Sequence, residues 1–182
     1  MEELTTAIRN KMALKYGLII GAIYLVLFTG INVLVGNFIT YNAMRVIGYI
    51  LYFVIMGMFI TQIKKENGGY LEFKEAFGAA FVMILTANIL YYVYSYVYFQ
   101  WINPHFMEQM KVSVVSFMEK MKAPDDKIEK TIQDMDKQIA DSKSFNIGHI
   151  LMGFFGFLIL DSLFGMIVCA IVKKNRPMFD NQ

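Results

Sequence analysis

The sequence predicts an all-α integral membrane four-helix bundle, with an extracytoplasmic helical hairpin between its third and fourth spans. Of its 182 residues, 57% are hydrophobic and 18% are charged, whereas soluble proteins average about 45–50% and about 25%. The charges are also segregated, because Asp, Glu, Lys and Arg are absent from 16–44, 46–63 and 76–107. Charge-free runs of this length are typical of membrane spans.

Four segments have the length and composition of a transmembrane helix. A helix needs roughly 20 mostly apolar residues to cross a hydrocarbon layer of about 30 Å, since every backbone polar group must be paired internally. The predicted spans are 16–35, 44–63, 77–99 and 147–172. The whole chain, residues 1–182, then forms one membrane domain. In the first span, Gly17 and Gly21 are four residues apart, a spacing that lets two helices approach closely.

The placement of Lys and Arg predicts the orientation. Nine cationic residues lie before the first span, between the second and third, and after the fourth: Arg9, Lys11, Lys15, Lys64, Lys65, Lys74, Lys173, Lys174 and Arg176. The opposite side offers Arg45 and a third connection in which seven lysines are balanced by eight acidic residues. Because cytoplasmic loops carry the excess of Lys and Arg, we expect both termini to be cytoplasmic.

The third span ends in a dense series of aromatic residues. They are Tyr91, Tyr92, Tyr94, Tyr96, Tyr98, Phe99 and Trp101. Amphipathic rings of this kind gather at membrane interfaces, where one end of the ring is apolar and the other is wet. We therefore expect an aromatic belt that marks the extracytoplasmic boundary.

The third connection, 103–143, predicts a helical hairpin. Asn103 can cap a helix that starts at Pro104, and Ala123-Pro124 interrupts the pattern before a second start at Asp125. The first arm carries a broad apolar stripe that we expect to face a partner: Phe106, Met110, Phe117 and Met121. The second arm carries a narrower seam: Ile128, Ile132, Met135 and Ile139. The seam cannot bury the whole stripe, so an apolar strip stays exposed for a protein partner or a homo-oligomer.

One formally charged residue, Asp161, lies deep in a span. A carboxylate at that depth costs roughly 2.5–3.5 kcal/mol on insertion scales, so it either stays protonated or finds hydrogen-bonding partners. Counting helical rise from each span centre places Tyr24, Thr86 and Asn88 at nearly the same depth. We therefore expect an intramembrane polar cluster of these four residues, which acts either as hydrogen-bonded glue between helices or as a proton relay.

No motif in the sequence predicts catalysis. Gly-x-Ser-x-Gly, His-Glu-x-x-His and a Gly-rich phosphate loop followed by Lys are all absent. His105 and the methionines of the first hairpin arm could hold Cu(I), but packing explains the same methionines. We expect no enzyme activity, cofactor or metal and, with a net charge of +2, no nucleic-acid partner.

The second connection, 64–77, reads KKENGGYLEFKEAF. With the aromatic exit of the third span, Asn103-Pro104 followed by Phe106, and the charged hairpin, it resembles a four-span membrane family of Bacteroidota known only as a domain of unknown function (DUF family 4199). The resemblance covers essentially the whole chain. It implies a multi-pass protein of the bacterial inner membrane with a periplasmic hairpin, and it supplies no activity, cofactor or catalytic residue.

Two hypotheses for the function follow, and the lipid bilayer is a partner in both. The broad stripe favours a non-catalytic inner-membrane accessory or scaffold protein whose periplasmic hairpin engages a partner. The buried Asp161 favours a small proton-coupled or lipid-handling carrier centred on that residue. A chain of four spans is small for a transporter, and this one shows no clear inverted repeat. The accessory protein is therefore the leading hypothesis at this point.

Overall fold

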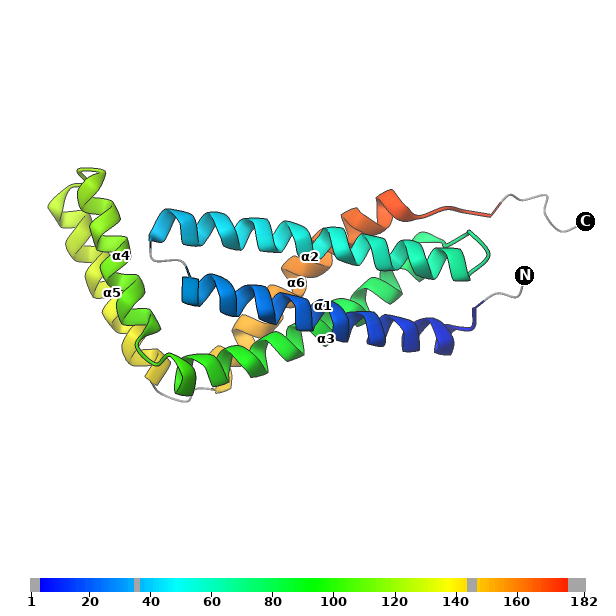
Figure 1. Ribbon diagram of the computed structural model, residues 1–182, viewed down its shortest axis with the longest axis horizontal. Coiled ribbons are helices and arrows are strands. Elements are labelled where there is room, and N and C mark those ends of the chain that lie inside the picture. The colour runs from blue at the N-terminus through cyan, green and yellow to red at the C-terminus, as the bar shows by residue number, and fades with distance from the viewer. Residues whose placement is uncertain (1–3, 35–36, 144–146, 177–182) are drawn as a thin grey trace, which may run out of the picture.

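Six α-helices and one π-helical turn make up the described part of the chain in the computed structural model, which covers residues 4–34, 37–143 and 147–176 (Figure 1). The helices are α1 (Thr6–Leu34), α2 (Phe38–Glu66), α3 (Phe73–Val97), α4 (Phe106–Lys120), α5 (Asp125–Lys143) and α6 (Ile147–Val172), and the π-helical turn η1 is Tyr98–Ile102. The predicted all-α bundle, with a hairpin between the third and fourth spans, is confirmed.

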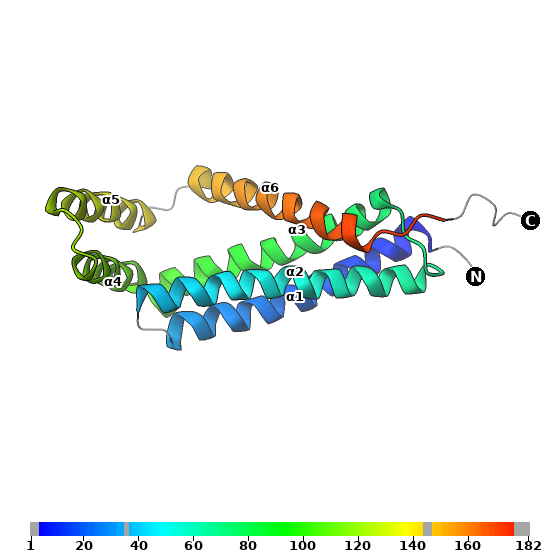
Figure 2. The same cartoon turned by 90° about the horizontal axis from the view of Figure 1, so that it is seen from above.

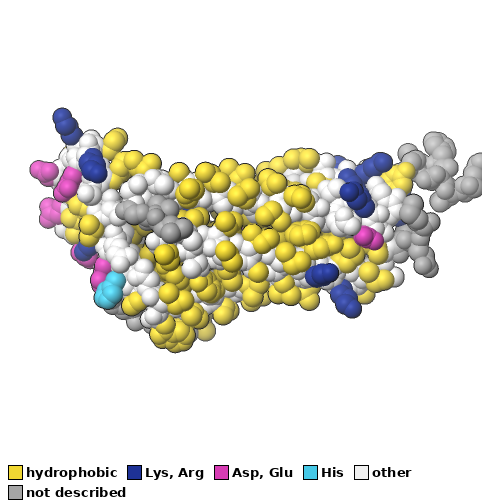
Figure 3. Space-filling model, in the orientation of Figure 1, with side chains coloured by type: hydrophobic (Ala, Val, Ile, Leu, Met, Phe, Trp, Pro, Cys, Tyr) yellow, Lys and Arg dark blue, Asp and Glu magenta, His cyan; other side chains and the backbone are white. Residues whose placement is uncertain are grey.

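Four helices are long and apolar enough to cross a membrane. Each predicted span lies within one of them or its continuation into η1, apart from residue 35, which lies outside the described residues. Only 22% to 39% of each apolar window is buried inside the chain, so most of this surface needs a bilayer to cover it. Figure 3 shows the result, a broad apolar belt with charged side chains gathered toward both ends.

The described chain begins and ends on one side of the bundle, here called the termini end, whereas α4 and α5 lie at the opposite hairpin end (Figure 1). The hairpin projects at a steep angle to the spans. Figure 2 shows α6 close to α2 and α3 near the termini end and separated from α2 near the hairpin end. This divergence sets the shape of the space between α2 and α6.

Helices α1 and α3 pack closely because α1 presents glycine to α3. A Cβ added to Gly17 would lie 2.9 Å from Thr86 Cβ and 3.0 Å from Met83 Cα, and one added to Gly21 would lie 2.8 Å from Leu90 Cδ1. The predicted close approach at these glycines is therefore confirmed. Small and aliphatic residues of α1, α2 and α3 fill the surrounding core: Ala13, Ile20, Met56, Ile60, Ala76, Ala79, Ala80, Met83 and Ile84.

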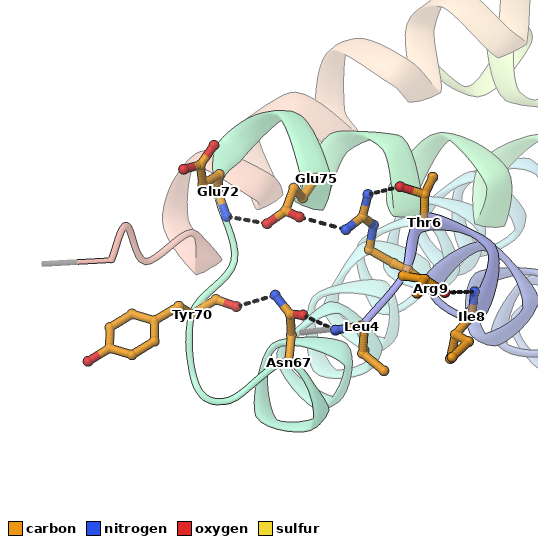
Figure 4. Close-up of polar contacts among 9 residues, drawn as sticks. Leu4, Thr6, Ile8, Arg9, Asn67, Tyr70, Glu72 and Glu75 are labelled. Atoms are coloured by element: carbon orange, nitrogen blue, oxygen red, sulfur yellow. Dashed lines mark hydrogen bonds and ion pairs between the residues drawn. The ribbon is translucent and has the colours of Figure 1, made fainter. Parts of the chain in front are cut away.

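An ion pair fastens α1 to α3 at the termini end (Figure 4). Arg9 Nη1 donates to Glu75 Oε1 at 2.6 Å, and Glu75 Oε2 accepts the backbone N–H of Glu72 at 3.1 Å. Arg9 is 8% exposed, so this cation is paired within the chain instead of lying free in solvent. One glutamate thereby holds the start of α3 and the start of α1 together.

The turn between α2 and α3 is held by Asn67. Its side chain accepts the backbone N–H of Leu4 at 2.8 Å and donates to the carbonyl of Tyr70 at 2.9 Å (Figure 4). Gly68 and Gly69 follow with φ of 75° and 87°, a region that glycine occupies without the steric penalty of a Cβ. The Gly-Gly pair in the sequence is thus explained by the reversal of the chain.

The same turn is joined to the segment after α6. Leu71 and Lys174 exchange two backbone hydrogen bonds of 2.9 Å, which form an isolated antiparallel bridge. Lys64 Nζ also donates to the carbonyl of Val172 at 2.8 Å, which satisfies one of the unpaired carbonyls at the end of α6. The ends of α2 and α6 are therefore linked at the termini end.

At the hairpin end, aromatic residues form a second core. Tyr98 is 1% exposed and packs with Phe28, Tyr41 and Phe106. The expectation that the rings from Tyr91 to Trp101 all line a membrane belt is therefore wrong for Tyr98, whose ring contacts Phe28 of α1 and Phe106 of α4. Tyr96 and Trp101 are exposed as a belt requires.

The hairpin starts later than the sequence predicts. Helix α4 begins at Phe106 and not at Pro104, because η1 carries α3 onward and the N–H of Asn103 donates to the carbonyl of Tyr98. Helix α5 begins at Asp125, as predicted. Lys111 Nζ donates to Asp136 Oδ1 at 2.6 Å, which joins the two arms.

Candidate functional site

A cavity of about 500 Å³ lies between α2, α3 and α6, within the apolar belt. Its walls also include one residue of α1. The lining residues are Tyr24, Asn42, Arg45, Val46, Tyr49, Ile50, Tyr52, Ala87, Asn88, Tyr91, Phe157, Leu160, Asp161 and Phe164. Mostly apolar walls with a few convergent polar groups are typical of ligand-binding sites.

Asp161 is the polar centre of this cavity and is 4% exposed. Its Oδ2 accepts a hydrogen bond from Asn88 Nδ2 at 3.0 Å, and its Oδ1 accepts one from the Tyr49 hydroxyl. The donors come from α3 and α2, so the carboxyl of α6 connects three helices. Each oxygen uses one of its two lone pairs on these bonds, so Asp161 keeps the capacity to accept further donors.

Tyr52 adds an unsatisfied polar group to the cavity. The residue is 6% exposed, and its hydroxyl has no hydrogen-bonding partner among the residues that the structure describes. Its ring lies 5.8 Å from that of Tyr24, which is 5.6 Å from that of Tyr91. Buried polar groups are nearly always paired in native proteins, so a free hydroxyl in a cavity indicates a place for a ligand or an ordered water.

Arg45 lines the cavity on the side of the hairpin end, one helical turn before Tyr49. It is half-buried, and its guanidinium lies 5.6 Å from the centre of the Tyr41 ring. Within residues 4–34, 37–143 and 147–176, no carboxylate forms an ion pair with it. The cation is thus held near the cavity without an anion of its own.

A second cavity of about 390 Å³ adjoins the first along α2 and α6. Its lining residues are Tyr49, Ile50, Phe53, Val54, Gly57, Phe164, Ile167, Val168, Ile171 and Val172. Tyr49, Ile50 and Phe164 line both cavities. Ile50 is 57% exposed and Phe164 is 42% exposed, so the shared wall reaches the lipid-facing surface. We call the two cavities together the α2–α6 crevice.

Comparison with known proteins places the chain in a family. Residues 15–174 match the family described as "Protein of unknown function (DUF4199)". The chain belongs to the DUF4199 family. The matched region includes nearly all of the four spans and the whole hairpin, so the resemblance drawn from the sequence is confirmed. Comparison with curated proteins gave no match, and comparison with solved structures gave none.

In this DUF4199 chain, the structure brings together three of the four residues expected in the polar cluster. Asp161 and Asn88 are hydrogen-bonded, and Tyr24 lines the same cavity. Thr86 lies elsewhere, because its hydroxyl donates to the carbonyl of Val82 at 2.7 Å and its Cβ faces Gly17 of α1. The sequence reasoning missed Tyr49, which donates to Asp161.

The hairpin residues of this DUF4199 chain divide into packed and exposed sets. Phe106 is buried in the aromatic cluster, Met110 packs against that cluster, and the Phe117 ring lies 5.3 Å from the Phe38 ring of α2. Met121, which directly follows the last residue of α4, is 67% exposed, and so is Val112 of α4, which lies outside the predicted stripe. Most of the four residues expected to face a partner therefore contact the chain itself, and Met121 is the exposed one.

Proposed function

We propose that this chain is a small lipid-handling carrier of the bacterial inner membrane, which binds an amphiphilic molecule in the α2–α6 crevice without catalysing a reaction. The observation that carries the proposal is a cavity inside the apolar belt that contains Asp161, Asn88 and the unpartnered hydroxyl of Tyr52. Its volume of about 500 Å³ falls within the range of small-molecule sites.

A purely structural role explains Asp161 less well. Hydrogen-bonded glue between helices requires donors for the carboxyl, which Tyr49 and Asn88 supply, but it requires no adjoining cavity. The cavity lining includes no second carboxylate and no histidine, so a proton relay through Asp161 would have to run through tyrosine hydroxyls. Binding of an amphiphile accounts for the acid, the cavity and the apolar extension together, so we favour the lipid-handling form of the carrier.

The proposed orientation places the termini end in the cytoplasm and the hairpin in the periplasm. The nine Lys and Arg residues counted from the sequence all belong to segments at the termini end, and such an excess is characteristic of the cytoplasmic side. Arg45 and the adjoining part of the first cavity then lie toward the periplasmic leaflet. The carrier would receive its ligand from that half of the bilayer.

The amphiphile retained by the purified protein tests this proposal. Asp161→Leu removes the polar centre while keeping a side chain of similar size, and we expect native mass spectrometry in mild detergent to show at least a tenfold loss of retained lipid. Ser162→Ala is the matched control, because the Ser162 hydroxyl donates to the carbonyl of Leu158 and does not line the cavity. Equal retention in Asp161→Leu and wild type would refute the proposal.

A second candidate is the accessory or scaffold protein whose periplasmic hairpin engages a protein partner. The observation in its favour is that Val112 of α4 and Met121, which directly follows α4, are each 67% exposed. Exposed apolar groups on a helix outside the bilayer often belong to a contact surface. The two functions are compatible, since the crevice and the exposed face of α4 use different residues.

A further inference from the structure

Three chemically different zones follow one another along α2 in the crevice. Arg45 lies nearest the hairpin end, and Tyr49, which is hydrogen-bonded to Asp161, lies about 6 Å further along the helix. From Phe53 to Gly57 the helix lines the second cavity, which is apolar. A ligand lying along α2 therefore meets a cation, then a carboxyl group, then hydrocarbon.

The zone around Asp161 is suited to an ammonium group. The carboxyl can accept donors beyond Tyr49 and Asn88, and Tyr52, whose buried hydroxyl is unpaired among the described residues, lines the same cavity. The rings of Tyr24 and Tyr91 line the same cavity. Aromatic faces combined with an acid attract substituted ammonium groups through cation–π and charge interactions.

The zone around Arg45 is suited to an anion. A guanidinium presents a planar set of donors that matches the oxygens of sulfonate, phosphate or carboxylate groups. Arg45 lines the cavity and has no carboxylate partner among the described residues. A terminal anion on the ligand would supply that partner.

The second cavity is suited to an alkyl tail. Of its ten lining residues, Tyr49 alone has a polar side chain, and it lies at the junction with the first cavity. The remaining walls come from aliphatic and aromatic residues of α2 and α6 and from Gly57. A tail lying there exchanges one apolar environment for another at no cost in polar desolvation.

We infer that the ligand is a zwitterionic amphiphile in which the ammonium group lies between the tail and a terminal anion. The juxtaposition that carries this is the order of Arg45, Asp161 and the apolar cavity along the crevice. Phosphocholine and phosphoethanolamine lipids have the opposite order, with the phosphate between tail and ammonium. The inference rests on the proposed function and specifies the ligand class for the same site.

Two probes that differ in charge order provide the test. An alkyl sulfobetaine has the order tail, ammonium, sulfonate, and an alkyl phosphocholine of the same tail length has the reverse. Each is added at the same small mole fraction to the wild-type protein in dodecyl maltoside micelles, and bound probe is counted by native mass spectrometry. We expect the sulfobetaine to bind about tenfold tighter or more, because only its charges both find partners.

Substitutions in the protein then test which residue binds each charged group of the probe. Arg45→Gln should weaken sulfobetaine binding and leave an alkyltrimethylammonium probe, which has no anion, unchanged. Asp161→Asn should weaken both probes, since each carries the ammonium group. Ser162→Ala should alter neither. The wild-type comparison needs no variant, so it decides the charge order even if one of these proteins folds poorly.

The outcomes separate this inference from the proposed function. Equal binding of sulfobetaine and phosphocholine, with both lost in Asp161→Leu, would overturn the charge order while the crevice remains an amphiphile site. A preference for phosphocholine would overturn it as well. Probe binding that is indifferent to Asp161 substitutions would overturn both the inference and the proposed function.

Discussion

At the residue scale, Gly17 sets the distance between α1 and α3. An added methyl group at this position would meet Thr86 Cβ at 2.9 Å and the backbone of Met83 at 3.0 Å, so the two helices would have to move apart. We expect Gly17→Ala to destabilise the fold by about 1–3 kcal/mol, the usual cost of overpacking. Thermal unfolding in detergent, followed by circular dichroism, measures the effect.

Gly30 of the same helix provides the control. A Cβ added there has no heavy atom within 4 Å, and alanine is a better helix former than glycine by about 1 kcal/mol. Gly30→Ala should therefore be neutral or slightly stabilising. A Gly17→Ala protein as stable as Gly30→Ala would show that the α1–α3 contact is looser than the structure indicates.

Arg9 is a residue whose role differs from that of its cationic neighbours. Replacing it with leucine leaves the Glu75 carboxylate with the Glu72 N–H but without its cation. We expect Arg9→Leu to destabilise the fold by about 1–3 kcal/mol, below the cost of breaking a fully buried pair, because the Glu75 side chain is 31% exposed. Lys11→Leu, at an exposed position of the same helix, should change the melting temperature little.

For the candidate site, the sequence predicts which polar side chains lie at a similar depth in the bilayer, but it does not predict the direction in which each of them points. Asn88 and Thr86 lie at similar depth, yet positions two apart on an α-helix point about 200° apart, so both could not face Asp161. The angle between these two positions follows from the sequence alone, and it excludes either Thr86 or Asn88 as a neighbour of Asp161. Tyr49 was missed for a different reason. Its contact with Asp161 depends on the tilt of α6 against α2, and this tilt is set by packing against neighbouring helices and not by the number of residues along the chain.

At the scale of elements, α4 packs against the bundle through Phe117 and leaves other apolar side chains exposed. The Phe117 ring lies 5.3 Å from the Phe38 ring of α2, whereas Val112 of α4 and Met121, which directly follows α4, are each 67% exposed. We expect Phe117→Ser to loosen α4 from the bundle, which faster amide hydrogen exchange in α4 would reveal. The double variant Val112→Ser and Met121→Ser should leave that exchange unchanged.

The same double variant tests the accessory function. If the hairpin binds a protein partner, crosslinking in the native membrane should recover that partner with the wild type and lose it with the double variant. Phe117→Ser alone cannot decide the matter, because it also disturbs packing within the chain. Crosslinked products that are identical in the double variant and the wild type would count against a partner surface at these residues.

The elements themselves were largely predictable from sequence, and their junctions were not. Charge-free runs indicate helices that need a bilayer, and Ala123-Pro124 indicates the break before α5. The continuation of α3 into η1 and the later start of α4 depend on a hydrogen bond from the N–H of Asn103 to the carbonyl of Tyr98. Burial of Tyr98 depends on contacts with Phe28, which is distant in sequence, and with Phe106, which the chain reaches only after the turn at 103–105.

At the scale of the whole molecule, the charge distribution predicts the topology. Periplasm-active reporters fused after Asp126 should be active, whereas fusions after Gly69 or Gln182 should be silent. The physical reason is the excess of Lys and Arg at the termini end, which is retained in the cytoplasm. Active fusions after Gly69 together with a silent fusion after Asp126 would invert the proposed orientation and place Arg45 in the other leaflet.

The link between the ends of α2 and α6 has a mechanical consequence for the crevice. Lys64 holds the last turn of α6, and the Leu71–Lys174 bridge holds the segment after it. Helices α2 and α6, which form the two walls of the crevice, are therefore joined at the termini end. Any widening of the crevice is therefore expected to increase toward the hairpin end, the side on which Arg45 lies. In the proposed carrier, a ligand that enters from the hairpin end meets the Arg45 cation first.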